Sequence, residues 1–289
     1  MDIALSSIEL LLRHPLASRP RRLVPKVREW KTAWHLARLR RSIRRQAPGD
    51  LVRCLNYDVR INDNHNFYIL YKDIFVNRIY HFDTPRPAPL ILDCGSNIGM
   101  SLLYFKHVYP GARIVGFEPD PAVFLYLEEN VRQNRLSHVR LVPAAVSDRV
   151  GPMALYADGK YSSFLSDMSS RAAPKGWATH EVPSIRLRDY LVEPVDFLKM
   201  NIEGAEWSVL ADSEDRLEYV REMVIEYHHL PGLPRTLHKI LDLLHGCGFE
   251  YLINDFDTES NCGVRPPFRL APGTRYFLLI YARRTTRHH

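Results

Sequence analysis

The hydrophobic pattern becomes regular from Leu90 onward, where short apolar runs alternate with segments of helical periodicity. Apolar runs of this length are typical of buried strands, and their alternation with helices indicates a mostly parallel sheet. We therefore predict an α/β fold with helices on both faces of the sheet. The predicted strands are 90–95, 112–120, 138–147, 195–201, 221–229, 249–255 and 275–284, and the predicted helices are 101–109, 122–134, 204–217 and 236–248.

Two segments of the chain do not follow this alternation. Residues 58–82 are rich in Val, Ile, Tyr and Phe with Asn and Asp between them, which indicates short strands or a hairpin, and the Pro-rich stretch 84–89 is expected to be a connector. Residues 156–182 are long and polar, with Tyr161 and Trp177 among them. Loops of this length are often functional, so this one is interpreted either as a lid over an acceptor or as a disordered excursion.

Residues 1–50 are expected to be a helical N-terminal extension ahead of a main domain at 51–289, whose core spans about 88–285. A short apolar helix near the N-terminus is followed by a second helix, in which Val27, Trp30 and Trp34 share one face. The second helix leads into an arginine-rich stretch, so the extension differs in character from the rest of the chain.

The positive charge of the chain is concentrated in this extension. The net charge is +6, but the stretch from Arg13 to Arg45 holds twelve Lys and Arg against one acid, Glu29, which leaves the remainder at about −5. One interpretation is peripheral contact with a membrane or another polyanion through residues 13–45. The other is a helix that packs its Trp face on the main domain and keeps its arginines in water.

The 46% hydrophobic content is enough for a globular core, and no apolar stretch approaches the roughly 18 residues of a membrane-spanning helix. The acids Asp2 and Glu9 stand where a secretory signal would carry positive charge. The four cysteines form no CxxC pair and no zinc-like spacing, so we expect buried free thiols. These features favour a cytoplasmic protein, with peripheral contact at the inner membrane left open.

The stretch LDCGSNIG, which begins at Leu92, joins the first predicted strand to a helix. In parallel sheets, ligands bind beyond the carboxyl ends of the strands. A phosphate-binding P-loop would need a lysine that this turn lacks, and a dinucleotide diphosphate would be repelled by Asp93. S-adenosylmethionine fits better, because Asp93 suits its ammonium, directly or through water, and backbone N–H groups suit its carboxylate. Gly95 and Gly99 are expected to let the ligand approach the backbone.

The next two strand ends support the same ligand. Glu118 stands where an acid accepts hydrogen bonds from both hydroxyls of a ribose, and the small residues around Ala145 leave a slot for a flat adenine. The residues expected to bind the cofactor are Asp93, Gly95, Ser96, Asn97, Gly99, Glu118, Pro119, Ala145 and Ser147.

These motifs, together with DFLKMNIEGAEWSVL at 196–210 and VIEYHH at 224–229, resemble the class I S-adenosylmethionine-dependent methyltransferases and, more narrowly, the FkbM family. The resemblance covers roughly residues 60–285. It implies a Rossmann-like, seven-stranded sheet whose last strand is antiparallel. It also implies O-methylation of a hydroxyl on a sugar or natural-product-like molecule, so we expect a saccharide or glycolipid-like acceptor.

The chain departs from the family at Asn201, where an Asp is usual. The candidates for catalysis at the ends of the fourth and fifth strands are His228, Asn201, Glu203, Glu226 and Lys199. His228 is favoured as general base because an unperturbed histidine titrates near neutral pH. The alternative for His228 is a structural role, in which it only forms a hydrogen bond to the loop that follows. The alternative for Lys199 is an internal ion pair. A divalent cation on these oxygen and nitrogen ligands is not favoured, because the spacing is no metal signature.

Two other functions are weighed against an O-methyltransferase. Asn201 suggests a catalytically degenerate module that holds the cofactor without transfer. The basic extension suggests a nucleic-acid methyltransferase, but the positive charge lies outside the catalytic region and the Asn-Pro-Pro-aromatic motif used on flipped bases is missing after the fourth strand.

Overall fold

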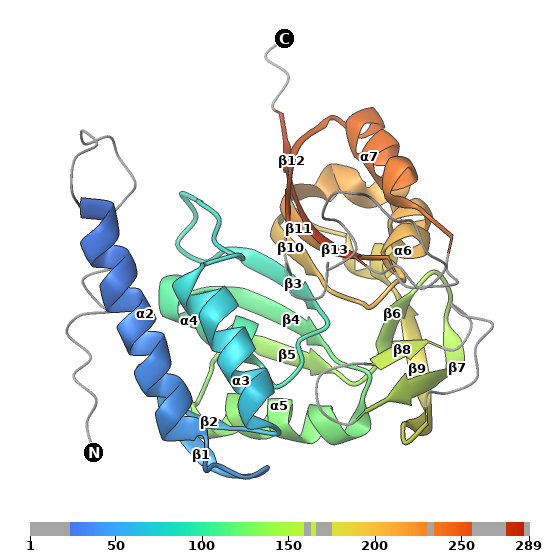
Figure 1. Cartoon of the computed structure of the whole chain (residues 1–289). Coiled ribbons are helices and arrows are strands. Elements are labelled where there is room, and N and C mark those ends of the chain that lie inside the picture. The colour runs from blue at the N-terminus through green and yellow to red at the C-terminus, as the bar shows by residue number, and fades with distance from the viewer. Residues whose placement is uncertain (1–23, 159–162, 166–174, 230–233, 256–275, 286–289) are drawn as a thin grey trace, which may run out of the picture.

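A computed structural model describes residues 24–158, 163–165, 175–229, 234–255 and 276–285. Seven strands form one sheet in the order β12-β13-β11-β10-β3-β4-β5, and only β13 runs antiparallel to its neighbours (Figure 1). The strands are β3 (Leu90–Cys94), β4 (Arg113–Phe117), β5 (Val139–Val142), β10 (Val195–Met200), β11 (Val220–His229), β12 (Phe249–Asp255) and β13 (Tyr276–Arg284). The expected seven-stranded sheet with an antiparallel last strand is confirmed.

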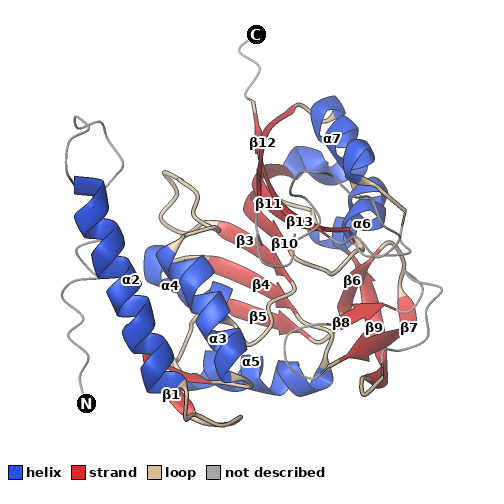
Figure 2. Ribbon diagram, viewed as in Figure 1, coloured by secondary structure: helices blue, strands red, loops and turns tan. Residues whose placement is uncertain are grey.

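The sheet is buried on both faces, which explains why its central strands β3 and β10 are mostly apolar and buried along their whole length. Along β3, Ile91 packs into one hydrophobic cluster while Leu90 and Leu92 pack into another on the opposite face. Helices cover both faces (Figure 2). Helices α4 (Met100–Val108) and α5 (Pro121–Gln133) contribute to the first cluster, and α6 (Glu206–Asp212) and α7 (Leu237–Gly246) contribute to the second.

A capping side chain fixes where helix α5 begins. Asp120 accepts hydrogen bonds from the backbone N–H groups of Ala122 and Val123 at the start of α5, with Pro121 at the first helical position. The helix predicted over 204–217 is interrupted: α6 ends at Asp212, and a 3₁₀ helix, η4 (Glu214–Tyr219), follows.

The prediction for residues 58–82 is wrong for most of the segment. A hairpin is present, β1 (Leu51–Cys54) with β2 (Tyr57–Arg60), but helix α3 (Asn64–Leu70) and a π-helical turn, η1 (Tyr71–Val76), follow it. Asp63 caps α3 by accepting from two backbone N–H groups. The buried Phe67, Tyr71 and Ile74 recur at helical spacing, so the aromatic content belongs to a helical face.

A second sheet stands where a strand end and a polar loop were expected. Its four strands lie in the order β6-β9-β7-β8 and are β6 (Ala145–Ser147), β7 (Gly151–Ala157), β8 (Ser163–Leu165) and β9 (Ala178–Arg186). The strand predicted over 138–147 therefore divides between two sheets. Pro143 lies between the parts and cannot donate to a strand ladder. A 3₁₀ helix, η3 (Leu187–Tyr190), leads from β9 back to the main sheet.

Helix α2 (Val24–Ile43) packs on the body through a different face from the one predicted. Leu39 and Ile43 are buried, and His35 Nε2 lies 3.1 Å from the hydroxyl of Tyr71, whereas Trp34 is 59% exposed. The side chains of Val27 and Trp30, and the predicted first helix, lie outside the described residues.

Three cysteines fall within the described residues, and all are free; Cys54 and Cys94 are buried. Cys262 lies outside them. In the part of the chain that the structure describes, none of the helices combines the length and the apolar character needed to cross a bilayer.

Candidate active site

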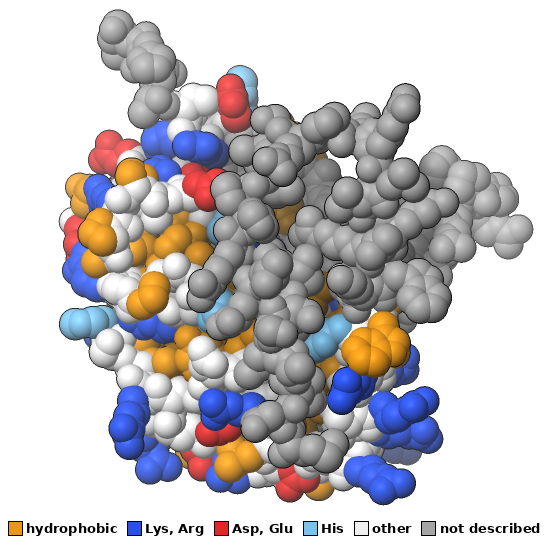
Figure 3. All heavy atoms as spheres, turned by 90° about the vertical axis from the view of Figure 1, so that its left-hand side faces the viewer, with side chains coloured by type: hydrophobic (Ala, Val, Ile, Leu, Met, Phe, Trp, Pro, Cys, Tyr) orange, Lys and Arg blue, Asp and Glu red, His pale blue; other side chains and the backbone are white. Residues whose placement is uncertain are grey.

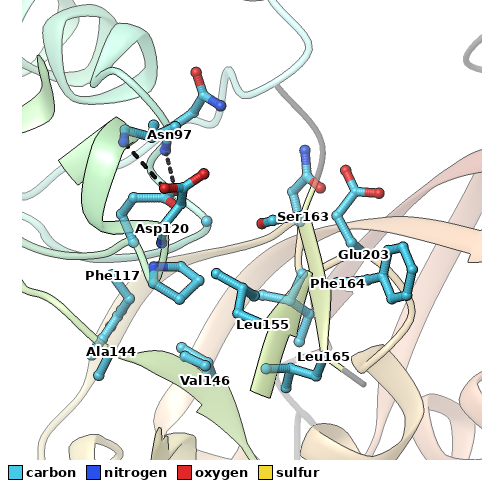
Figure 4. A pocket seen from close by; sticks show the side chains of 17 residues that line it. Asn97, Phe117, Asp120, Ala144, Val146, Leu155, Ser163, Phe164, Leu165 and Glu203 are labelled. Carbon is cyan, nitrogen blue, oxygen red and sulfur yellow. Dashed lines mark hydrogen bonds between the residues drawn. The ribbon is translucent and has the colours of Figure 1, made fainter. Parts of the chain in front are cut away.

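A pocket opens where the carboxyl ends of β3, β4 and β10 face the second sheet (Figure 4). The space it encloses, counted together with the solvent at its open mouth, is about 670 Å³. Residues from both sheets line it: Gly95, Asn97, Phe117, Glu118, Pro119, Asp120, Val123, Ala144, Ala145, Val146, Leu155, Ser163, Phe164, Leu165, Asn201, Ile202 and Glu203. The pocket thus lies at the sheet edge where the sequence placed the cofactor.

The glycines of the first turn are required mainly for packing. Gly95 has a φ of +84°, and a Cβ there would stand 1.9 Å from the carbonyl oxygen of Asn201. Gly99 has a φ of +91°, and a Cβ there would meet Leu127 of α5 at 2.9 Å. Gly95 still lines the pocket, but Gly99 does not, so the expected approach of a ligand to the backbone applies to one of the two glycines.

Glu118 is held in the pocket wall by two backbone donors. The N–H of Asn97 donates to Oε2 at 2.8 Å, and the N–H of Asp120 donates to Oε1 at 3.0 Å (Figure 4). Burial raises the pKa of Glu118 to about 7, although these two hydrogen bonds lower it. Each carboxylate oxygen keeps a lone pair beyond its backbone donor, so the pair of oxygens can accept from both hydroxyls of a ribose.

The pocket next to Glu118 is apolar and formed by side chains from both sheets. Pro119 and Ala145, both expected from the sequence to bind the cofactor, line it. The other apolar residues of this part are Phe117, Val123, Ala144, Val146, Leu155 and Leu165. Their composition suits a flat purine. Ser147 does not line the pocket; it is buried and its hydroxyl donates to Asp148 at 3.1 Å.

Asp93 and Lys199 form a buried ion pair beneath the pocket. Lys199 Nζ lies 3.1 Å from Asp93 Oδ1, Ser101 donates to the other carboxylate oxygen, and both members of the pair are almost fully buried. Lys199 also donates to the carbonyl of Gly95. Lys199 is therefore an internal ion-pair partner, and Asp93 is turned away from the direct ligand contact that the sequence suggested. Ser96 is likewise buried, and its hydroxyl donates to the carbonyl of Asp93.

At the far side of the pocket, three carboxylates surround His228. Nδ1 of His228 lies 3.0 Å from Glu206 Oε1, and Nε2 lies 3.8 Å from Glu203 Oε1. Burial alone would lower the pKa of His228, but Glu203 and Glu206, with a smaller contribution from Glu226, outweigh it and raise the pKa to about 10. The charges of these carboxylates favour the imidazolium form of His228, which has no lone pair to accept a proton. The prediction of His228 as general base assumed an unperturbed pKa, so a proton acceptor next to His228 is an alternative to test against it.

Glu203 is the carboxylate of this cluster that lines the pocket. It lies beside Phe164 and across the pocket from Asn97 and Asp120 (Figure 4). Its φ of +54° is unusual for a residue with a side chain, and such strain often accompanies a functional position. Burial raises the pKa of Glu203, while the charge of His228 opposes the rise. A carboxylate with a raised pKa is a better proton acceptor than an ordinary one.

Asn201 and Glu226 lie next to this cluster. Asn201 lines the pocket and donates through Nδ2 to Glu226 Oε2 at 2.8 Å, and Tyr80 donates to the other oxygen of Glu226. Burial raises the pKa of Glu226. An Asp at position 201 would set a second carboxylate against Glu226, so the amide is well matched to its neighbour. Among the residues that the structure describes, no three His, Cys, Asp or Glu side chains are arranged to hold a metal ion.

Sequence reasoning missed the wall that the second sheet contributes. Leu155, Ser163, Phe164 and Leu165 come from β7 and β8, in or beside the stretch interpreted as a polar loop. In the structure, buried residues alternate with less buried ones along GPMALYA, which is the period of a strand, but residues 153–157 are all apolar, so the sequence pattern does not show the alternation.

Comparison with known proteins adds an independent finding. The family model described as the methyltransferase FkbM domain matches residues 93–251. The 31-O-demethyl-FK506 methyltransferase FkbM of Streptomyces tacrolimicus is 30% identical over 213 residues, which cover 62% of this chain and 80% of that protein. The methyltransferase sdnD of Sordaria araneosa is 29% identical, covering 60% and 79%. The 2-O-methyltransferase NoeI of Sinorhizobium fredii (strain NBRC 101917 / NGR234) is 32% identical, covering 55% and 72%.

Proposed function

Because this chain belongs to the FkbM methyltransferase domain family and is an S-adenosylmethionine-dependent methyltransferase, we propose that it methylates a hydroxyl group of a sugar or natural-product-like small molecule. Two relatives support oxygen as the acceptor atom, since one is named a 31-O-demethyl-FK506 methyltransferase and the other a 2-O-methyltransferase. The observation that carries the proposal is a pocket with a buried carboxylate, Glu118, on one side and a second carboxylate, Glu203, on the other.

The residues of the pocket fit the cofactor. Glu118 would hold the ribose hydroxyls through oxygens that backbone donors already orient, and the apolar part around Val146 and Leu155 would enclose the adenine. Gly95, Asn97 and Pro119 line the same space. Asp93 would contact the amino-acid end of the cofactor only through a water molecule, or would affect it indirectly by holding the turn after β3 in place. When bound, S-adenosylmethionine supplies a methyl group activated by a sulfonium sulfur.

The chain itself then has two tasks, to align a hydroxyl with the methyl carbon and to accept the proton. We assign the second task to Glu203. The carboxylate of Glu203 would accept the proton of the acceptor hydroxyl when that oxygen takes the methyl group that bound S-adenosylmethionine would supply. His228 keeps Glu203 ionised through its positive charge, and Glu206 fixes the His228 ring by a hydrogen bond at 3.0 Å. Asn201 and Glu226 position the end of β10 beside them.

The experiment that tests this function is transfer of a labelled methyl group to a panel of saccharides, glycolipid precursors and polyketide alcohols. The proposal predicts at least one product whose methyl group resists mild base, as an ether does. Products formed only on carboxylic acids, which release methanol in mild base, or only on amines would contradict it.

Three further proposals concern the domain division, the cellular compartment and a peripheral contact. We propose that residues 1–50 are an extension to a methyltransferase domain at 51–289, and that the enzyme acts in the cytoplasm. We also propose that residues 13–45 make a peripheral contact with a membrane or another polyanion, separately from the acceptor site.

A further inference from the structure

The outer side of helix α2 carries a cluster of arginines that the pocket does not use. Arg38, Arg40, Arg41, Arg44 and Arg45 are all exposed. Within residues 24–158 and the other described ranges, no ion pair joins any of the five to a carboxylate. Figure 3 looks onto this side of the molecule and shows Lys and Arg side chains gathered along its lower part. Five uncompensated cations on two helical turns and the residues after them make a surface that attracts anions.

The helix is fixed in this orientation by its other side. Leu39 and Ile43 are 7% and 3% exposed and belong to the core cluster, and His35 contacts the hydroxyl of Tyr71. Because this face is committed to the body, the helix cannot rotate to bury its arginines. The basic surface is therefore a fixed part of the fold rather than one state of a swinging arm.

Trp34 adds an aromatic group to the same outer side. Its side chain is 59% exposed, and the guanidinium of Arg38 lies 5.2 Å from the centre of its ring. In a second such pair, Arg40 of α2 lies 5.7 Å from the ring of Tyr68, a half-buried residue on the adjoining α3. Exposed aromatic rings beside arginines are typical of proteins that adsorb at the headgroup level of a bilayer.

The location of the surface separates it from catalysis. Figure 1 shows α2 beyond α3 and α4, on the side of the molecule away from the second sheet that walls the pocket. A nucleic acid held by α2 would have to pass around the body to present a base to Glu203, whereas a membrane contact on this side leaves the pocket open to water. The position of the arginines thus favours an anchoring surface over a substrate-binding one.

We propose that Trp34 and the cluster Arg38, Arg40, Arg41, Arg44 and Arg45 form a docking surface for a bilayer rich in acidic phospholipid, which holds the enzyme with its pocket away from the membrane. This inference narrows the proposed contact of residues 13–45 but does not depend on the acceptor. Each arginine near an anionic surface strengthens binding by roughly fivefold at physiological salt.

The test is flotation of the full chain with vesicles of phosphatidylcholine alone or mixed equally with phosphatidylglycerol. The wild-type protein should float with the mixed vesicles and not with the neutral ones, and high salt should release it. Replacement of Arg41, Arg44 and Arg45 by Gln should weaken binding by roughly a hundredfold. The matched control replaces Lys175, Arg235 and Lys239 by Gln, which removes the same charge from exposed positions elsewhere and should retain binding within threefold.

Two further measurements separate membrane binding from catalysis. Trp34→Phe should reduce the rise in tryptophan fluorescence that accompanies vesicle binding, and methyl transfer in solution should be unchanged by the triple arginine variant. Equal flotation of wild type and triple variant, or no flotation with acidic vesicles, would overturn the proposal. Retention on duplex DNA or RNA in place of vesicles would overturn it in favour of a nucleic-acid partner. Neither result bears on the proposed O-methyl transfer, which the acceptor assay tests without vesicles.

Discussion

Replacement of Glu203 by Gln tests the assignment of the proton acceptor. Gln keeps the size of the side chain and its place on the pocket wall but cannot take up a proton. His228 Nε2 lies 3.8 Å from Glu203 Oε1, so the variant also removes one of the charges that hold the pKa of His228 near 10. The fold should be little affected, because Glu206 still accepts a hydrogen bond from the other ring nitrogen.

The expected loss follows from the role of the base. A positioned proton acceptor contributes roughly 10² to 10⁴ in rate, so kcat of Glu203→Gln should fall by at least about a hundredfold. The affinity for S-adenosylhomocysteine should change by less than about fivefold, because the ribose and adenine contacts remain. His228→Gln should lose only about tenfold at neutral pH, since it removes the cation that favours ionised Glu203 but leaves the carboxylate. Glu193→Gln, at a surface carboxylate paired with Arg113, is the charge control.

The pH profile of methyl transfer distinguishes the two candidate bases. If Glu203 accepts the proton, kcat/KM rises with pH through the raised pKa of this carboxyl and levels off above it, and His228→Gln moves the rise to higher pH. If His228 were the base, the rate would go on rising tenfold per pH unit until about pH 10. A profile of that second kind, or a Glu203→Gln enzyme within threefold of wild type, would refute the assignment.

Two other predictions concern stability. The pKa of His228 is raised from 6.5 to about 10, so this group contributes stability that is complete below pH 6.5 and lost as pH rises to about 10. Urea unfolding should therefore show a difference between wild type and His228→Gln that shrinks over this window by on the order of 5 kcal/mol, and a constant difference would contradict the raised pKa. Gly95→Ala, whose Cβ would stand 1.9 Å from the Asn201 carbonyl, should cost about 2–4 kcal/mol. Gly49 has a similar positive φ, but a Cβ there would meet no atom within 4 Å, so Gly49→Ala should lower the free energy of unfolding by only about 1–2 kcal/mol. Equal destabilisation by the two substitutions would contradict the argument that Gly95 is required for packing.

The sequence was sufficient to predict the sheet and the proximity of Glu118 and Asn97, because both depend on local patterns. Glu118 and Asn97 stand at strand ends, and parallel strands end at the same edge of a sheet, so their proximity followed from the alternation of strands and helices. The second sheet was missed because β8 has only three residues and β7 was obscured by the polar stretch that follows it.

The catalytic side was harder to predict because it depends on contacts between elements. Lys199 and Asp93 are direct neighbours on adjacent strands β10 and β3, and that pairing requires the strand order. The surroundings of His228 depend on the fold in the same way: Glu203 and Glu206, which raise its pKa, approach it from the turn after β10 and the start of α6. A sequence pattern can predict which residues belong to such a cluster, but not the protonation states that their neighbours in the fold impose.

Calorimetric titration of S-adenosylhomocysteine tests the central claim, that the cofactor lies in this pocket with its ribose on Glu118. The account predicts one site per chain and a loss of at least about tenfold for Glu118→Ala, with Glu118→Gln as the variant that keeps the shape. Glu128→Gln, an exposed carboxylate on α5, should bind as wild type does. Since the pKa of free Glu118 is about 7 and the ionised form accepts the hydroxyls, affinity should also rise about tenfold from pH 6 to pH 8. Undiminished affinity in Glu118→Ala, or no binding by the wild type, would contradict the account.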